Sequence, residues 1–419
     1  MRKMRDSGID WIGTIPQDWQ LSKIGSLYTQ RNEKVSDKDY QPLSVTMQGI
    51  LPQLATAAKT DDGDNRKLVR VGDFAINSRS DRRGSCGISP LDGSVSLINI
   101  ILTPRTAMHP GYYNWLFHTT LFADEFYKWG HGIVADLWTT HWQEMKSITV
   151  PVPEYAEQER IAAFLDAECA EIDTVLEKTR ASIEEYKKLK QAVITQAVTK
   201  GIRGDRPMKD SGIEWIGDIP AEWDVIRVKQ LLKERNERSK EGKEEPLSMS
   251  QKVGLVPTKF LESIPNMASS FVGAKLAYVD DLVFNKLKAH LGVFSVSRYD
   301  GLVSPDYAVY CSTGKSNLKY LEYIFKTPQC IGEFRKKSTG IAAGLMRLYT
   351  EGLFSIYLPY PALSEQEEIA EYLNEKCAGI DALIVKKQQY LIEIENYKKS
   401  LIYEYVTGKK EVKTSVLAD

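Results

Sequence analysis

The sequence predicts an α+β protein in which two pseudo-repeated globular domains are joined by a long antiparallel two-helix coiled coil. Residues 157–199 and 365–407 each carry apolar side chains at alternating spacings of three and four, which is the period of a coiled coil. The chain also repeats itself, with an offset that begins at 204 residues and settles at 208. A repeat of this length indicates two copies of one structural unit, each ending in a long helix.

The first apolar seam predicts a helix of roughly 63 Å at 1.5 Å per residue, too long to bury its seam against itself. It therefore requires a partner, and the second seam supplies a helix of the same length. The two seams consist of Ile161, Leu165, Cys169, Ile172, Leu176, Ile183, Tyr186, Val193 and Ala197, and of Ile369, Leu373, Cys377, Ile380, Ile384, Leu391, Ile394, Leu401 and Tyr405.

Both helices begin with Glu-Gln-Glu, at residues 157–159 and 365–367. Ser364 followed three residues later by Glu367 predicts a capping box at the second start, in which each side chain binds a backbone N–H of the first turn. The first start has Ala156 at the corresponding position, so we expect it to fray more.

The globular parts open with the same motif, MRDSGIDWIGTIPQDW at 4–19 and MKDSGIEWIGDIPAEW at 208–223. Tryptophan, glycine and proline at these spacings are more typical of a terminus packed onto its own domain than of a binding site. The pattern divides the chain into a first globular domain at 1–153, a first long helix at 154–200, a linker at 201–206, a second globular domain at 207–361, a second long helix at 362–408 and a C-terminal tail at 409–419.

Within each globular domain, short β-branched and aromatic runs predict strands, and longer runs predict one helix, over Tyr112–Trp129 and Leu318–Lys337. Asp92-Gly93 and Asp300-Gly301 occupy equivalent positions and predict tight turns, where glycine accepts a positive φ. The predicted strands are Leu68–Ile76, Ser94–Leu102, Phe271–Val283, Gly292–Val296 and Tyr307–Tyr310.

Length and composition indicate a folded protein of more than one domain, with 419 residues of which 42% are hydrophobic and 10% aromatic. No run approaches 18 consecutive apolar residues, and the basic N-terminus is not followed by the apolar core of a signal peptide. We therefore expect a soluble, cytoplasmic protein. The five cysteines form no C-x-x-C pair, which argues against a disulfide framework and a zinc site.

Charge is divided unevenly along the chain. Residues 1–150 carry 17 basic and 16 acidic side chains and residues 207–361 carry 21 and 18, whereas the helical segments 154–200 and 362–419 carry 7 against 10 and 8 against 11. The basic excess therefore lies off the helices. It is too small to identify a nucleic-acid-binding protein without further observations.

No catalytic motif is present in the sequence. It contains no phosphate-binding loop, nucleophile elbow or H-E-x-x-H, and its five histidines lack the spacing of metal ligands. Arg79, Arg82 and Arg83 correspond to Leu287, His290 and Leu291 in the second half, so a catalytic site there would not be repeated. We expect no catalytic residue, no metal and no cofactor.

Two loops in each half differ in side chains while the flanking sequence matches. Residues 77–84 align with 285–292, and residues 128–132 align with 336–340. Basic and short polar side chains beside glycine can bond DNA bases or phosphates, although any one of them can also be a solvated turn residue. The candidate DNA-contacting residues are Ser78, Arg79, Arg82, Arg83, His131, Lys286, Lys288, His290, Lys336, Lys337, Ser338 and Thr339.

With two SGI(D/E)WIG openings, two α+β domains and two EQE(R/E)IA helices followed by Val-Thr and a nearby glycine, the whole chain resembles the specificity (S) subunit of type I restriction-modification systems. The resemblance implies that the globular parts are target-recognition domains, each reading one half of a bipartite, asymmetric DNA sequence. It also implies that the paired helices separate these domains and bind two methyltransferase (modification) subunits, which motor and nuclease (restriction) subunits join.

The length of the helices agrees with this implied role, because helices of about 63 Å would hold two half-sites several base pairs apart. The sequence leaves two other readings open. A stand-alone pseudo-dimeric DNA-binding regulator would bind its site tightly without partners, and a coiled-coil scaffold would bind only proteins. An autonomous nuclease or methyltransferase is disfavoured, since the sequence has no motif for either.

Overall fold

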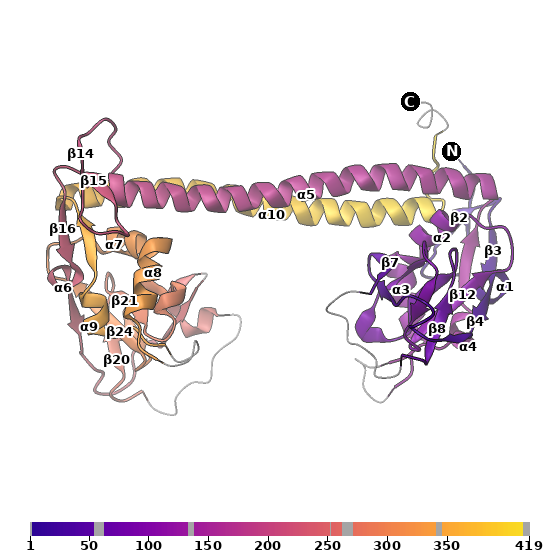
Figure 1. Cartoon of the computed structure of the whole chain (residues 1–419), viewed down its shortest axis with the longest axis horizontal. Helices are drawn as coiled ribbons and strands as arrows, with labels where there is room; N and C mark the ends of the chain where they lie inside the picture. Colours follow the sequence, from indigo (N-terminus) through magenta and orange to yellow (C-terminus); the bar gives the residue numbers. More distant parts are fainter. Residues whose placement is uncertain are drawn as a thin grey trace. The chain divides into compact units, whose positions relative to one another are not determined.

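The computed structural model describes residues 2–53, 63–132, 138–251, 253–261, 271–340 and 346–413. The chain forms two compact units, unit 1 (Met1–Arg180 with Gln388–Asp419) and unit 2 (Ala181–Lys387). Each unit combines one globular part with a portion of both long helices (Figure 1). This confirms the predicted α+β class with two similar globular parts and two long helices.

Unit 1 is built on a four-stranded antiparallel sheet with the order β10-β9-β12-β4. Two helices pack their aromatic side chains against it, and the rings of Phe74 and Phe117 lie 4.4 Å apart. Phe74, Phe117, Phe122 and Phe126 are fully buried. The elements of this core are β4 (Tyr28–Arg31), β9 (Phe74–Asn77), β10 (Cys86–Ile88), β12 (Asn99–Pro104), α2 (Pro110–Phe117) and α3 (Thr120–Lys128).

Smaller sheets surround this core, and they pair β1 with β2, β13 with β3, β6 with β7, and β8 with both β11 and β5. These elements are β1 (Met4–Asp6), β2 (Thr14–Pro16), β3 (Gln20–Lys23), α1 (Ile24–Leu27), β5 (Lys34–Val35), β6 (Leu43–Thr46), β7 (Gly49–Pro52), β8 (Arg66–Val69), η1 (Ser80–Arg82), β11 (Gly93–Val95), α4 (Trp142–Met145) and β13 (Thr149–Val152).

Unit 2 repeats the arrangement of unit 1, with a four-stranded sheet in the order β17-β24-β21-β22. Its elements are β14 (Met208–Asp210), β15 (Asp218–Pro220), β16 (Asp224–Arg227), α6 (Val228–Leu231), β17 (Leu232–Arg235), β18 (Leu247–Ser250), β19 (Gly254–Pro257), η3 (Thr258–Phe260), β20 (Lys275–Ala277), β21 (Leu282–Asn285), η4 (Ala289–Leu291), β22 (Phe294–Val296), β23 (Gly301–Val303), β24 (Tyr307–Ser312), α7 (Leu318–Phe325), α8 (Pro328–Lys337), α9 (Thr350–Phe354) and β25 (Tyr357–Tyr360).

Several predicted elements are each two elements in the structure. The predicted strands at 68–76, 94–102 and 271–283 are interrupted by turns, the first at Gly72, whose φ is +86°, and the third at Asp280, whose φ is +66°. The two predicted helices also break in the middle, because Thr119 and Thr327 cap a new helix by accepting the backbone N–H three residues later. Hydrophobic runs gave no sign of these breaks.

The predicted Asp-Gly turns are wrong, since Gly93 and Gly301 each begin a strand. The glycine is needed there for close packing, because a Cβ on Gly93 would lie 2.5 Å from the carbonyl oxygen of Gln41 and a Cβ on Gly301 would lie 2.2 Å from that of Glu245. The preceding carboxylates, Asp92 and Asp300, instead accept backbone N–H groups across the sheet edge.

The long helices are α5 (Tyr155–Lys200) and α10 (Leu363–Val406), and they run alongside each other within each unit (Figure 1). In unit 1, Lys398 Nζ lies 2.7 Å from Asp173 Oδ1. In unit 2, Lys190 Nζ lies 2.6 Å from Asp381 Oδ2. Residue numbers increase along α5 while those of the paired α10 residues decrease, so the two helices are antiparallel, as predicted. No helix within the described ranges is long and apolar enough to cross a membrane.

The predicted capping box at the second helix is wrong, because α10 begins at Leu363 and Ser364 lies inside its first turn. The shared Glu-Gln pair joins each helix to its globular part instead. Glu157 accepts the indole N–H of Trp19 at 2.9 Å, and Glu365 accepts that of Trp223 at 3.0 Å. The tryptophans of the opening motif therefore pack against their own unit, as predicted, and bind the helix start.

The next residue of each pair, Gln158 or Gln366, bridges two backbone segments. Its amide N–H donates to the carbonyl of Pro153 or Pro361, and its amide oxygen accepts the backbone N–H of His109 or Asn317. Both glutamines are buried. The motif thus fixes the angle at which each helix leaves its sheet.

Candidate nucleic-acid interface

In unit 1 the two predicted loops are connected by a third segment, residues 138–140. The backbone N–H of Thr140 donates to the carbonyl of Ser78 at 3.0 Å, and that of Ser80 donates to the carbonyl of Trp138 at 2.8 Å. Thr139 and His131 exchange backbone hydrogen bonds of 2.9 and 3.1 Å. The two loops are therefore held side by side at one place on the unit.

Unit 2 has the same connection at positions 208 residues later. The backbone N–H of Leu348 donates to the carbonyl of Lys286 at 3.0 Å, as Thr140 does to Ser78. Thr339 and Arg347 exchange hydrogen bonds of 2.9 and 3.0 Å. The backbone frame around the loops is thus repeated, while the side chains that it presents differ between the units.

The first loop begins with residues that serve the frame. Ser78 is 4% exposed, and both its hydroxyl and its backbone N–H donate to the carbonyl of Ile98. The Tyr127 hydroxyl donates to the carbonyl of Asn77 at 2.8 Å, and burial raises the pKa of this phenol. Arg79 follows with its side chain 37% exposed and 3.3 Å from Asp81. Of these residues, Arg79 is the one available to a ligand.

Two arginines follow on the same loop, and they differ in their contacts. The Arg82 side chain is 67% exposed, with its nearest carboxylate, that of Asp81, 3.8 Å away. Arg83 forms an ion pair with Asp124 on α3, and its guanidinium lies 5.9 Å from the ring centre of Tyr127. Arg82 therefore presents its charge outward, whereas Arg83 connects the loop to the helix.

The predicted residues of unit 2 likewise include exposed side chains and side chains that are bonded or buried within the unit. Lys288, Lys337 and Thr339 are exposed, and Lys286 is bonded to the carbonyl of Pro305 at 3.3 Å. His290 is 7% exposed and its backbone carbonyl accepts from Arg335 at 3.3 Å. His290 therefore belongs to the packing of η4 and is not placed to contact a ligand.

The end of α8 completes the second loop of unit 2. Lys336 is paired with Glu333 at 2.7 Å in an exposed (i, i+3) contact, and the Ser338 hydroxyl donates to the carbonyl of Phe334 at 2.6 Å. An exposed ion pair of this kind costs little to break, so Lys336 remains available to a phosphate. His131 of unit 1, which corresponds to Thr339, is exposed.

The third segment and its neighbours are not among the residues predicted from the sequence. Trp138 is 38% exposed, Thr139 lies between the two loops, and Arg347 in unit 2 is 43% exposed and 3.6 Å from Asp306. The signal that could have found them is the repeat itself, because Thr139 and Arg347 are 208 residues apart and differ in kind, as the loop residues do.

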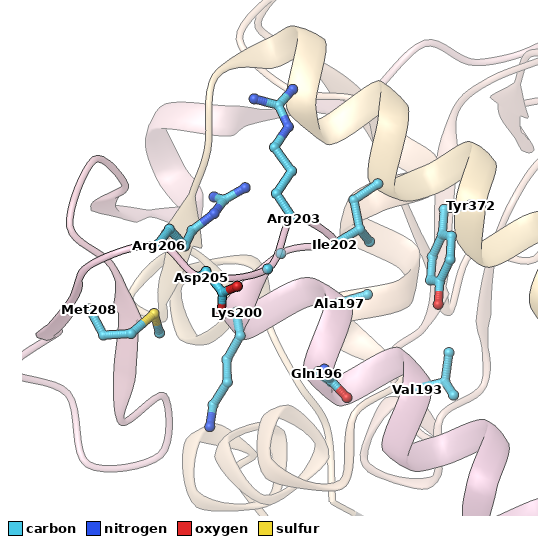
Figure 2. A pocket seen from close by; sticks show the side chains of 12 residues that line it. Val193, Gln196, Ala197, Lys200, Ile202, Arg203, Asp205, Arg206, Met208 and Tyr372 are labelled. Carbon is cyan, nitrogen blue, oxygen red and sulfur yellow. The ribbon is translucent and has the colours of Figure 1, made fainter.

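A cavity of about 480 Å³ lies at the end of α5 in unit 2, next to the linker (Figure 2). Two of its three basic lining residues, Arg203 and Arg206, are already paired, and the third, Lys200, is exposed. Arg206 lies 2.7 Å from Glu365 and 3.1 Å from Glu222, and Arg203 lies 2.6 Å from Glu368. We therefore assign this cavity to the joint between linker and helix.

Within the described ranges, no group of three or more histidine, cysteine, aspartate or glutamate side chains is arranged to hold a metal ion. The loops instead gather exposed basic, hydroxyl and aromatic side chains on a fixed backbone. Arginine and lysine can bond phosphates and guanine edges, and threonine and serine can bond phosphates or bases. Both units therefore present side chains that can bond nucleic acid, and the exposed tryptophans Trp129 and Trp138 belong to unit 1.

No protein-family model matches the chain. Two relatives from Methanocaldococcus jannaschii are each 23% identical to it, the type I restriction enzyme MjaVIII specificity subunit and the putative type I restriction enzyme MjaX specificity subunit. The first alignment covers 95% of this chain and 94% of the relative, and the second covers 96% of each.

Two solved structures have a similar fold. A chain from a study of complex assembly and conformational transition of the type I R-M system has a TM-score of 0.73 at 12% identity, covering 94% of this chain and 99% of that chain. The HsdS subunit from Thermoanaerobacter tengcongensis has a TM-score of 0.54 at 15% identity, covering 94% and 98%. The resemblance stated from the sequence is thus confirmed, and over nearly its whole length this chain is similar to the specificity subunits of type I restriction-modification systems.

Proposed function

We propose that this chain is the DNA sequence-specificity subunit of a type I restriction-modification complex and is not itself catalytic. Each unit reads one half of a bipartite, asymmetric DNA target through its loops and third segment. The paired helices set the spacer between the half-sites and dock two methyltransferase subunits. Motor and nuclease subunits join this assembly when the complex restricts DNA.

The observation that carries this proposal is the repeated frame with different side chains. The bond from Thr140 to Ser78 recurs as that from Leu348 to Lys286, yet Arg79 is replaced by Leu287 and Thr139 by Arg347. A catalytic site would need particular side chains in particular places. A DNA-recognition domain needs a constant backbone frame and variable side chains that contact bases. Phosphate contacts position such a domain on DNA, and base contacts specify the sequence.

The helices also carry features suited to partner subunits. In unit 1 the α10 side chains Tyr390, Ile392 and Tyr397 are 49%, 53% and 54% exposed. In unit 2 Leu383 and Val385 on the same helix are 43% and 62% exposed. Exposed apolar side chains on a helix favour a protein interface, and the neighbouring helix α5 carries exposed acidic residues such as Glu171 and Glu177.

The spacer role rests on helix length. Helix α5 has 46 residues and α10 has 44, which corresponds to roughly 65–70 Å of continuous helix at 1.5 Å per residue. Both helices have buried seam residues, including Leu165 and Leu373 at 0% exposure. A stiff pair of this length would fix the number of base pairs between the half-sites.

The test is reconstitution with a methyltransferase subunit from the same host, followed by selection of bound duplexes from a random library. We expect weak DNA binding by the chain alone, and tight binding to a bipartite sequence by the complex. Tight binding by the chain alone would instead favour a stand-alone regulator. Capture of the methyltransferase with no gain in sequence-specific binding would favour a protein scaffold.

A further inference from the structure

A cavity of about 370 Å³ opens in unit 1 between the first loop and the third segment. Its volume lies within the range of roughly 300–1,000 Å³ typical of ligand pockets. Its lining brings together three kinds of side chain that the sequence places far apart. These are the apolar pair Leu97 and Ile98 with Trp142, the amides Gln30 and Gln143, and the cations Lys67 and Arg79.

The apolar pair is exposed although it lies in a polar region of the surface. Leu97 is 38% exposed and Ile98 is 41% exposed. The Ile98 carbonyl accepts two hydrogen bonds from Ser78, and the next strand, β12, begins at Asn99, so the frame fixes the backbone of Ile98, next to Leu97. An apolar surface fixed in this way beside Arg79 is suited to contact with an apolar group on a charged ligand.

The amide of Gln143 lies at the rim of the same cavity on α4, and Lys146 donates to its oxygen. One lone pair and both N–H protons of this amide remain for a ligand. Lys67, which also lines the cavity, donates to the carbonyl of Asn99 at 2.7 Å, and burial lowers the pKa of its ammonium group. The hydrogen bond of Lys67 thus serves the protein structure, whereas the Gln143 amide can bond a ligand.

Unit 2 provides an internal comparison, because ion pairs and hydrogen bonds occupy the corresponding positions. Arg347 and Asp306 replace Thr139 and Ile98, and their side chains lie 3.6 Å apart. Glu234 and Thr350 replace Gln30 and Trp142, and are joined by a hydrogen bond of 2.7 Å. The combination of the exposed Leu97 and Ile98 side chains with the Gln143 amide is therefore specific to unit 1.

We propose that this cavity reads one A·T base pair from the major groove in the half-site of unit 1. The thymine 5-methyl group packs on Leu97 and Ile98, and the Gln143 amide bonds adenine N6 and N7. These are the contacts that distinguish an A·T pair in that groove, since glutamine bonds adenine bidentately and apolar side chains contact the thymine methyl. Arg79 binds the adjacent phosphate. The inference rests on the proposed function and adds which base pair this site takes.

The experiment uses the full chain reconstituted with its methyltransferase subunit and a duplex carrying the selected target. Each thymine of the unit 1 half-site is replaced in turn by deoxyuridine, which lacks only the methyl group. At one position we expect the Kd to rise about fourfold, as burial of one methyl group implies. The same replacement in the unit 2 half-site serves as the control for a general effect of deoxyuridine.

A double variant, Leu97→Ala with Ile98→Ala, identifies the protein side of the contact. It should bind thymine and deoxyuridine duplexes with equal Kd, and the Kd for the deoxyuridine duplex should match that of the unchanged protein, which shows that the variant is folded. Val71→Ala removes an apolar side chain of unit 1 that is 65% exposed and lies outside the cavity, so it should keep the fourfold discrimination.

The Gln143→Leu variant should accept other base pairs at the same position while retaining the rest of the target. The proposal is overturned if no thymine of the unit 1 half-site is sensitive to deoxyuridine, or if the double variant still discriminates. Both results presuppose sequence-specific binding by the unchanged complex. Absence of any such binding would instead contradict the proposed function.

Discussion

At the scale of single residues, the neighbouring arginines Arg82 and Arg83 on the first loop of unit 1 make different contacts. Arg83 connects the loop to α3 through Asp124, while Arg82 is 67% exposed and 3.8 Å from Asp81. The sequence placed both in the same candidate set, because a sequence shows charge and not pairing. The same is true of His290, whose burial at 7% exposure depends on the packing of η4.

The Arg82→Ala variant tests the outward-facing charge. We expect it to cost about 1–3 kcal/mol of binding free energy with relaxed choice at one base pair, as loss of a guanine contact does. Binding to the selected target and to its single-base variants is the measurement. A uniform loss for all sequences would show a phosphate contact instead. Arg298→Ala, which removes an equal charge from an exposed turn of unit 2, is the control.

A buried carboxylate gives unit 2 a pH dependence that unit 1 lacks at the same place. Burial opposes ionisation of Glu322, but Lys326 at 2.6 Å and Lys319 at 2.9 Å outweigh it, and the pKa falls below its ordinary value of 4.5. Glu322 accepts the backbone N–H of Val296, as the neutral Asn114 accepts that of Ile88 in unit 1.

Because the folded-state pKa is lowered, the stability that Glu322 contributes is present above its unfolded value and is lost as pH falls through the folded value. We therefore expect Glu322→Gln to lower the free energy of unfolding at neutral pH and to converge with the unchanged protein under acid conditions. Denaturant unfolding at several pH values measures this. Glu241→Gln, which removes an exposed carboxylate paired with Lys243 at 2.8 Å, should give no such pH-dependent difference.

At the scale of elements, the start of each long helix is the joint between helix and globular part. In unit 2, the side chains of Arg206 and Glu365 are 10% and 8% exposed, and Trp223 donates to the same carboxylate. The sequence predicted both helices well, since a periodic seam is a local property of the chain. It did not predict the joint, because Ser364 satisfied a local capping pattern while the indole of Trp223 comes from 142 residues away.

Replacing the buried carboxylate should therefore be costly. We expect Glu365→Ala to lower the free energy of unfolding by about 3–5 kcal/mol, because it removes the buried partner of Arg206 and the acceptor of the Trp223 indole, and leaves Arg206 with only the exposed Glu222. Its control lies one turn along the same helix. Glu368 pairs with Arg203, both about half exposed, and Glu368→Ala should cost less than about 1 kcal/mol. Equal effects in chemical denaturation would show that the joint does not depend on burial.

The length of the paired helices should determine the spacer between the two half-sites. Inserting four residues into each long helix adds about 6 Å, which we expect to lengthen the unread spacer by one or two base pairs. Mapping the methylated positions before and after insertion is the measurement. A spacer of unchanged length would rule out the helices as its determinant.

At the scale of the whole molecule, the repeat was the most informative feature of the sequence. It predicted two similar α+β parts, because residues that match at an offset of 204 to 208 occupy equivalent positions in the two parts. It did not show that strands break at Gly72 and Asp280, or that Thr139 lies between two loops. These features depend on turns and on backbone contacts between distant segments, and neither produces a periodic pattern in the sequence.

The proposed function predicts that the two units recognise their half-sites independently, because each unit has its own frame. Exchanging residues 60–140 for the same region of a relative should change only one half of the target, because these residues carry the loops and third segment of unit 1 alone. Selection of bound duplexes with the chimeric complex would show this. A change in both halves would contradict separate reading.

The central claim is that two units of one chain read two separate halves of one DNA sequence. Mapping of methylated bases in a host that carries this chain with its methyltransferase subunit tests that claim most directly. We expect methylation within two short, different specified segments separated by a fixed number of unspecified base pairs. Methylation within one continuous or palindromic sequence would contradict it.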